Sequence, residues 1–147
     1  MGIAAVAERG NHMTRTIRIL LIALFAETIT VGVWNALFPA SFYRNVPTVD
    51  LTPPFSEHFA RDFGTAFIGI AIVLAAAAWR PESILVIPAA AAYGAFAVPH
   101  FVFHASHLDH ASPGEAWLLN LVNAAVAVIA LLVIVLAVLR GRRWKSR

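Results

Sequence analysis

The chain has 147 residues, of which 60% are hydrophobic and only 13% are charged, and its formal net charge is +3. A soluble domain carries about a quarter charged residues, so this composition excludes an ordinary soluble protein and indicates a protein of the lipid bilayer. The absence of cysteine excludes disulfides, thiolate metal sites and cysteine nucleophiles. Because the basic residues lie beside apolar segments, we interpret them as topology signals and expect no nucleic-acid partner.

Four apolar segments approach the length of about 20 residues that a helix needs to cross a bilayer. They cover residues 17–37, 63–79, 83–104 and 116–139. A helix satisfies its own backbone hydrogen bonds in lipid, whereas the strands of a membrane barrel would alternate polar and apolar residues, which these runs do not. We therefore predict an all-α fold, a four-helix transmembrane bundle that forms one domain over residues 1–147. Residues 1–12 do not resemble a signal peptide and are expected to be disordered, with Met13 as an alternative start.

Two of the predicted helices are preceded by start signals. Ser112, Pro113 and Glu115 have the spacing of a capping box with proline at the first helical position. Thr52 and Pro53 offer a similar start ahead of the second span. The second helix is therefore expected to begin before the chain enters the membrane.

Lysine and arginine are distributed unequally between the two sides of the predicted bundle. If the four helices alternate in direction, nine of these residues share the side of the termini and two lie on the other side. The nine are Arg9, Arg15, Arg18, Arg80, Arg140, Arg142, Arg143, Lys145 and Arg147, and the two are Arg44 and Arg61. Since basic residues favour the cytoplasmic side, we predict cytoplasmic termini in a multi-pass protein of the plasma membrane.

Polar residues inside or beside the spans are the first candidates for a site. Glu27 lies near the middle of the first span, where an ionised carboxylate is costly, so it should face other helices, be protonated or pair with a polar group. Several others fall toward the predicted outer ends of the helices and suggest a polar cavity that opens outward. The full set of these candidates is Glu27, Asn35, Arg61, Asp62, Asn120 and Asn123. Asn120 and Asn123 are alternatively hydrogen-bonding contacts between helices.

The stretch "SEHFARDFG" places two pairs of polar residues one helical turn apart. Glu57 and Arg61 form one pair, and His58 and Asp62 form the other. Asp62 lies where the chain enters the membrane, so burial would require a partner, either Arg61 or a histidine of the third helix. Such a contact is either a clasp between helices or an acid–base or metal-supporting arrangement.

The stretch "VPHFVFHASHLDH" gathers four of the six histidines of the chain. Spacings of four and three residues put His100, His104 and His107 on one stripe of a helix, with His110 drifting off it. Imidazoles one turn apart can share a transition metal, and His58 is a further candidate ligand. The alternative is an interfacial cluster that hydrogen-bonds water and lipid headgroups.

The segments "ALFPASFYRNVP" and "EHFARDFGTAFIGIAIVLAAA" resemble the DoxX-like group of small four-helix membrane proteins. The matching residues are Pro39, Arg61, Asp62 and Gly64, within the first half of the chain. The resemblance implies a four-helix membrane fold, and some proteins of that group are associated with membrane redox systems and quinones. The histidine run does not map onto the group.

Three functions remain open at this point. The first is an accessory or partner-binding membrane subunit without catalysis of its own, for which no catalytic residue is assigned. The second is a metal- or haem-binding redox component that uses His100, His104 and His107. The third is a small proton-linked carrier that uses Glu27 and Asp62. The expected partners are the lipid bilayer and either another membrane protein or further copies of this chain.

Overall fold

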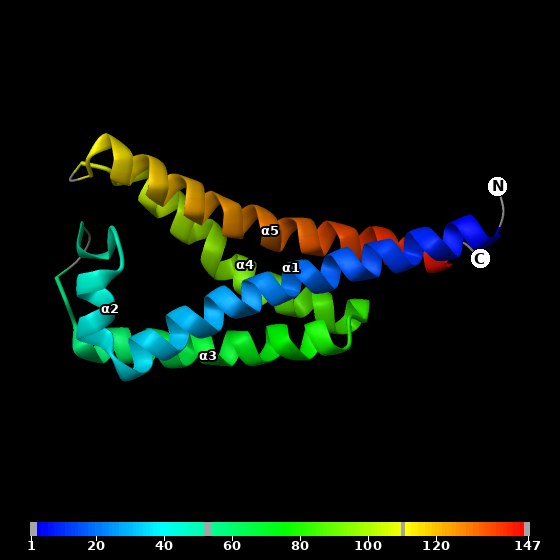
Figure 1. The fold of residues 1–147 in the computed structure, drawn as a ribbon, viewed down its shortest axis with the longest axis horizontal. Coiled ribbons are helices and arrows are strands. Elements are labelled where there is room, and N and C mark those ends of the chain that lie inside the picture. Colours follow the sequence, from blue (N-terminus) through cyan, green and yellow to red (C-terminus); the bar gives the residue numbers. More distant parts are fainter. Residues whose placement is uncertain (1–2, 52–53, 110, 146–147) are drawn as a thin grey trace.

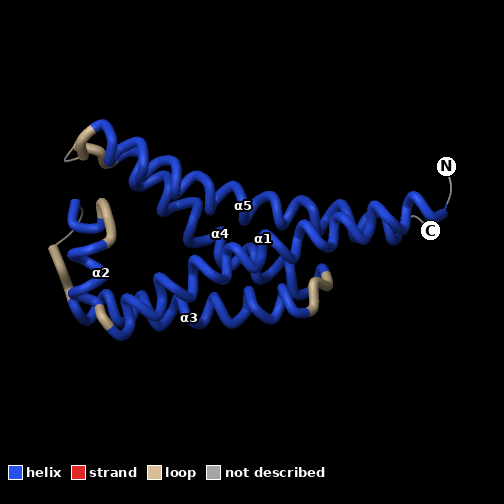
Figure 2. The backbone as a smooth tube through the Cα atoms, viewed as in Figure 1, coloured by secondary structure: helices blue, strands red, loops and turns tan. Residues whose placement is uncertain are grey.

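The computed structural model describes residues 3–51, 54–109 and 111–145, and within these ranges it contains helices and no strand (Figure 2). The prediction of an all-α fold is therefore confirmed. The elements are α1 (Ile3–Leu37), α2 (Pro39–Asn45), the 3₁₀ turn η1 (Val49–Leu51), α3 (Glu57–Trp79), α4 (Ser83–Ser106) and α5 (Pro113–Lys145).

Four of these helices, α1, α3, α4 and α5, are long and apolar enough to cross a membrane. They cover the four predicted spans, which indicates a multi-pass membrane protein. Successive long helices alternate in direction, so the two termini lie at the same end of the bundle (Figure 1). The cytoplasmic location of that end stays a prediction.

Two helix starts differ from expectation. We expected disorder over residues 1–12, but α1 is helical from Ile3, so the expectation is wrong for residues 3–12. That stretch is rich in alanine and lacks proline, so its residues are compatible with a helix.

The second spanning helix, α3, begins at Glu57 rather than at Pro53. Ser56 is its N-cap, and the Ser56 hydroxyl accepts a hydrogen bond from the Phe59 backbone N–H. Thr52 and Pro53 themselves lie outside the described residues.

The predicted capping box of α5 is present. The backbone N–H and the hydroxyl of Ser112 donate to Oε2 of Glu115 at 2.8 and 2.6 Å. The backbone N–H of Glu115 donates in return to the Ser112 hydroxyl at 3.4 Å. This reciprocal arrangement satisfies donors that the first turn of a helix otherwise leaves free.

The long helices form two pairs rather than an even bundle. α1 packs mainly against α3, and α4 packs mainly against α5. The pairs meet at the end that carries the termini and diverge toward the other end, where α2 and the chain after it lie in the opening (Figure 1). The fold therefore leaves space between the pairs at the end away from the termini.

Gly64 of α3 lets the backbones of α1 and α3 come into close contact. A Cβ atom on Gly64 would lie 2.5 Å from the Ala36 backbone nitrogen and 2.7 Å from the Gly32 carbonyl oxygen. No side chain fits at such distances, so glycine is required for the two backbones to approach this closely. One turn earlier, Arg61 Nη1 donates to the Ala36 carbonyl at 2.6 Å, which ties α3 to the end of α1.

Arginines close the end of the bundle that carries the termini. Arg140 of α5 donates to the Thr14 hydroxyl of α1 at 3.3 Å, to the Ser83 hydroxyl at 3.4 Å and to the Pro81 carbonyl. Arg18 donates through Nε to the Ala78 carbonyl at 3.1 Å, near the end of α3. Residues that we interpreted only as topology signals therefore also hold the helices together at this end.

Candidate functional site

A cavity of about 890 Å³ lies between the two helix pairs, on the side where they diverge. All four long helices contribute to its wall, together with α2 and the segment that follows it. Aromatic and aliphatic side chains form most of the lining, and its polar atoms are few. Small-molecule sites in proteins have this size and this mixture of an apolar wall with a few polar groups.

Glu27 of α1 and Tyr93 of α4 form a polar contact between two helices in the cavity wall. The Tyr93 hydroxyl donates to Oε2 of Glu27 at 2.8 Å. The Thr28 hydroxyl lies 3.2 Å from the same oxygen and 2.6 Å from the Leu24 carbonyl. The prediction that Glu27 faces other helices is confirmed. Tyr93 was missed because an alanine-rich segment surrounds it, yet a tyrosine within a membrane span itself signals a hydrogen-bond partner.

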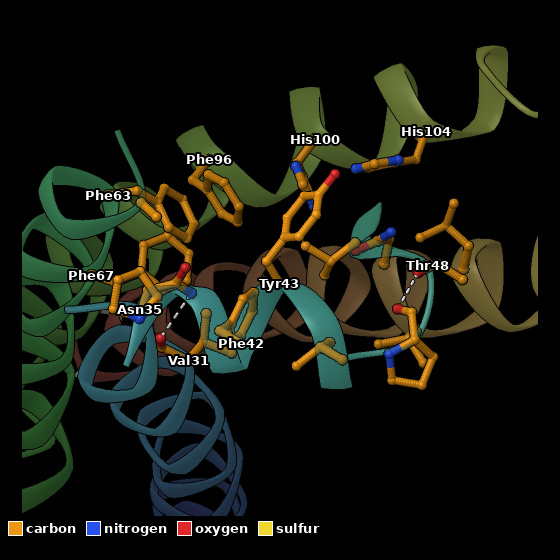
Figure 3. Close-up of a pocket in the computed structure, with 18 of the residues that line it drawn as sticks. Val31, Asn35, Phe42, Tyr43, Thr48, Phe63, Phe67, Phe96, His100 and His104 are labelled. Atoms are coloured by element: carbon orange, nitrogen blue, oxygen red, sulfur yellow. Dashed lines mark hydrogen bonds between the residues drawn. The ribbon is translucent and has the colours of Figure 1, made fainter. Parts of the chain in front are cut away.

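A series of rings runs along the cavity wall from Phe67 through Phe96 and His100 to His104 (Figure 3). The ring of Phe67 lies 6.5 Å from that of Tyr93 and 4.6 Å from that of Phe96, measured between centroids. Phe96 stacks on His100 at 4.7 Å, and His100 meets His104 edge to face at 4.4 Å. α4 thus presents aromatic faces, followed by two imidazoles, to the open space.

His104 combines burial with an unused hydrogen-bonding atom. The residue is only 8% exposed, and its Nδ1 atom is buried with no partner among the described residues. Figure 3 shows the ring of Tyr43 pointing from α2 toward His100 and His104. A buried polar atom without a partner costs about 1–3 kcal/mol, so this nitrogen is a candidate contact for a bound molecule.

His107 does not extend the pair formed by His100 and His104. α4 ends at Ser106, and the ring of His107 instead stacks on Phe103 at 4.2 Å. Its Nδ1 atom lies 2.8 Å from the Phe103 carbonyl oxygen. The predicted alignment of His100, His104 and His107 on one helical face required α4 to continue past His107, and it does not. His110 lies outside the described residues.

The two predicted pairs of the segment 57–62 are present, but they lie at the surface. Arg61 bonds Glu57 through Nε and Nη2 at 2.9 and 2.8 Å. His58 Nε2 lies 3.3 Å from Asp62 Oδ2, and these side chains are 90% and 66% exposed. The expectation that Asp62 is buried and pairs with a histidine of α4 or with Arg61 is therefore wrong. The turn that carries Asp62 is exposed, so the carboxylate needs no buried partner.

The predicted metal site is not assembled. The described residues include no group of three or more His, Asp or Glu side chains placed to hold one metal ion. The predicted ligands separate into the exposed His58, which pairs with Asp62, the adjacent His100 and His104, and His107 on Phe103. The predicted set of ligands is thus not brought around one metal ion, whereas haem binding by His100 and His104 stays a prediction.

Of the three candidate asparagines, Asn35 and Asn123 line the cavity and Asn120 does not. Asn35 is 4% exposed, lines the cavity and donates to the Val31 carbonyl of its own helix at 3.1 Å. Asn120 donates to the Ala116 carbonyl at 3.0 Å and is not part of the lining. The lining includes Glu27, Asn35, Asn123 and His100, but not Arg61, Asp62 or Asn120.

The cavity therefore combines an aromatic wall with several polar groups, among which two separated pairs stand out. Glu27 with Tyr93 forms one of them, and His100 with His104 forms the other. Such a site can bind and orient a molecule that is mostly apolar and carries a polar group. Comparisons of the chain with protein-family models, with curated proteins and with solved structures found no match.

Proposed function

We propose that this chain is a small integral membrane protein that binds a lipid-soluble, partly aromatic molecule in the cavity between its helix pairs. The observation that carries the proposal is the cavity itself, about 890 Å³ in volume and lined by all four long helices. A four-helix membrane protein whose only task was structural would gain stability by closing this space, because unfilled volume forfeits packing contacts.

The polar groups of the cavity support the binding of an elongated molecule. Tyr93 and His104 are separated by about three turns of α4, which corresponds to roughly 16 Å. Aromatic rings fill the wall between them. A ligand that spans this distance can place its apolar body against the rings and polar groups at both ends. The buried Nδ1 atom of His104 would gain the partner that it lacks.

The wider role that we propose is accessory. The protein would hold its ligand for a membrane protein partner or for further copies of itself in the plasma membrane. A DoxX-like relationship is part of the same proposal, and it rests on the sequence resemblance at Pro39, Arg61, Asp62 and Gly64. A proton-linked carrier that uses Glu27 stays a prediction, but Asp62 does not contribute to the cavity.

Occlusion of the cavity tests the proposal. Val126 of α5 lines the cavity, whereas Val128 of the same helix is 60% exposed and is not part of the lining. We expect Val126→Trp to fill part of the space and Val128→Trp to leave it open. The measurement is calorimetric titration of the purified protein in detergent with triphenylphosphine oxide, a neutral aromatic probe that carries one strong hydrogen-bond acceptor.

We expect saturable binding to the wild-type protein and to Val128→Trp, and a loss of about tenfold or more in affinity for Val126→Trp. The probe also partitions into the detergent micelles, but it does so equally with all three proteins. A difference in affinity between the proteins therefore measures binding in the cavity. Equal titration curves for the three proteins would contradict the proposed function.

A further inference from the structure

The charge distribution of the cavity identifies the class of its ligand. This inference rests on the proposed function and extends it: we propose that the cavity binds a lipophilic organic cation. The aromatic faces of α3 and α4 would contact the cation, and the carboxylate of Glu27 would neutralise it.

The lining contains one carboxylate and no basic side chain of the lysine or arginine type. Glu27 supplies that carboxylate, and the remaining lining residues are apolar, aromatic, amide, hydroxyl or imidazole side chains. Two arginines that bond carbonyls and hydroxyls between helices, Arg18 and Arg140, lie at the opposite, closed end. The cavity therefore favours positive over negative ligands, because an anion would meet a carboxylate without a compensating cation.

Glu27 has one oxygen satisfied and one oxygen free. Tyr93 and Thr28 both bond Oε2, and the described residues give Oε1 no donor. A carboxylate at this depth of a membrane span is costly unless a partner compensates its charge. A bound cation would supply that partner, whereas the two hydroxyls supply hydrogen bonds without charge.

Several of the aromatic rings that line the cavity form one cluster that reaches this carboxylate through Tyr93. The ring of Tyr93, whose hydroxyl bonds Glu27, lies 6.5 Å from the rings of both Phe67 and Phe96. Phe63 adds a further ring, 4.3 Å from Phe67 and 5.6 Å from Phe96. Organic cations bind over aromatic faces within about 6 Å, and removal from water strengthens the attraction. Rings and carboxylate together provide the two attractions that a lipophilic cation requires.

A pair of probes with one shape and opposite charge isolates the effect of charge. Tetraphenylphosphonium is a cation and tetraphenylborate is an anion of the same geometry. We expect tetraphenylphosphonium to bind the detergent-solubilised wild-type protein saturably and at least about tenfold more tightly than tetraphenylborate. Val126→Trp should abolish that binding, and Val128→Trp should retain it.

Two substitutions assign the effect to the proposed groups. Glu27→Gln keeps the shape of the side chain and an acceptor for Tyr93, but it removes the charge. It should weaken tetraphenylphosphonium binding by about tenfold or more, which is a larger loss than we expect for triphenylphosphine oxide, because the neutral probe loses no charge attraction. Phe96→Leu should weaken tetraphenylphosphonium about fivefold, a smaller loss because other rings remain.

The outcomes separate this inference from the proposed function. If triphenylphosphine oxide and tetraphenylborate bind as well as tetraphenylphosphonium, and Val126→Trp removes all three, the cavity binds ligands but the inference about charge is wrong. Unchanged binding of tetraphenylphosphonium by Glu27→Gln would also overturn it. If Glu27→Gln does not fold, two measurements still test the inference about charge. They are the affinities of the wild-type protein for the two ions and the affinity of Phe96→Leu for tetraphenylphosphonium.

Discussion

The hydroxyl of Tyr93 donates a 2.8 Å hydrogen bond to Oε2 of Glu27, and this contact joins the α1–α3 pair to the α4–α5 pair within the apolar region. It lies on the wall of the cavity between the two pairs. The same contact is thus a structural link between the pairs and the polar end of the candidate site.

Removal of the Tyr93 hydroxyl should destabilise the protein. We expect Tyr93→Phe to lower the free energy of unfolding by about 1–3 kcal/mol, because Glu27 loses its donor from α4 in an apolar environment. Titration with dodecyl sulfate in mixed micelles measures this change. Thr30→Val is the control, since the Thr30 hydroxyl is exposed and bonds only its own helix at Ala26.

The double variant Glu27→Leu/Tyr93→Phe extends this prediction. Replacing both partners by apolar groups leaves no unsatisfied acceptor, so the double variant should lose less stability than the sum of the single losses. Additive losses would show that the two side chains do not act as a pair.

Gly64 should not tolerate even one methyl group. An added Cβ would lie 2.5 Å from the backbone nitrogen of Ala36, and neither helix backbone can move aside cheaply. We expect Gly64→Ala to cost several kcal/mol or to prevent accumulation in the membrane, by separation of α1 from α3. Gly69→Ala lies in the same helix with nothing within 4 Å of its added Cβ. It should be neutral or slightly stabilising. Equal accumulation of the two variants would argue against the close contact of α1 and α3.

Arg140 should matter more than its neighbour Arg142, although both contribute equally to topology. Arg140 bonds Thr14, Pro81 and Ser83, whereas Arg142 is exposed. We expect Arg140→Gln to lower the unfolding free energy by about 1–3 kcal/mol, since three half-buried acceptors lose a charged donor, and Arg142→Gln to change it by less than about 0.5 kcal/mol. The measurement is the same dodecyl sulfate titration. Equal losses would indicate that net charge, rather than these bonds, stabilises this end.

The orientation of the bundle can be tested by cysteine labelling, because the natural chain contains no cysteine. Ser112 precedes α5 at the end away from the termini, and Glu82 lies in the connection between α3 and α4 at the end of the termini. We expect an impermeant maleimide to label Ser112→Cys on intact cells and to label Glu82→Cys only after the cells are broken. The opposite pattern would reverse the predicted orientation.

Local signals predicted the parts of the site that depend on a single helix. The pairs Glu57–Arg61 and His58–Asp62 follow from one turn of helical geometry, and both are present. The inward placement of Glu27 followed from the cost of a carboxylate in lipid. The expected burial of Asp62 was wrong, and the predicted metal ligands are not gathered into one group among the described residues, because both required two helices, or a longer α4, to bring side chains together.

The sequence by itself determined the four apolar helices, their alternation and the capping box of α5, because hydropathy and backbone hydrogen bonding act along one chain segment at a time. Only the tertiary structure decided that the helices form two diverging pairs and that Tyr93 is the partner of Glu27. Helices in lipid lack a hydrophobic force between them, so pairing depends on close backbone contacts such as Gly32 with Gly64 and on individual polar bonds. Those contacts join residues far apart in the chain, and no periodic pattern in the sequence specifies them.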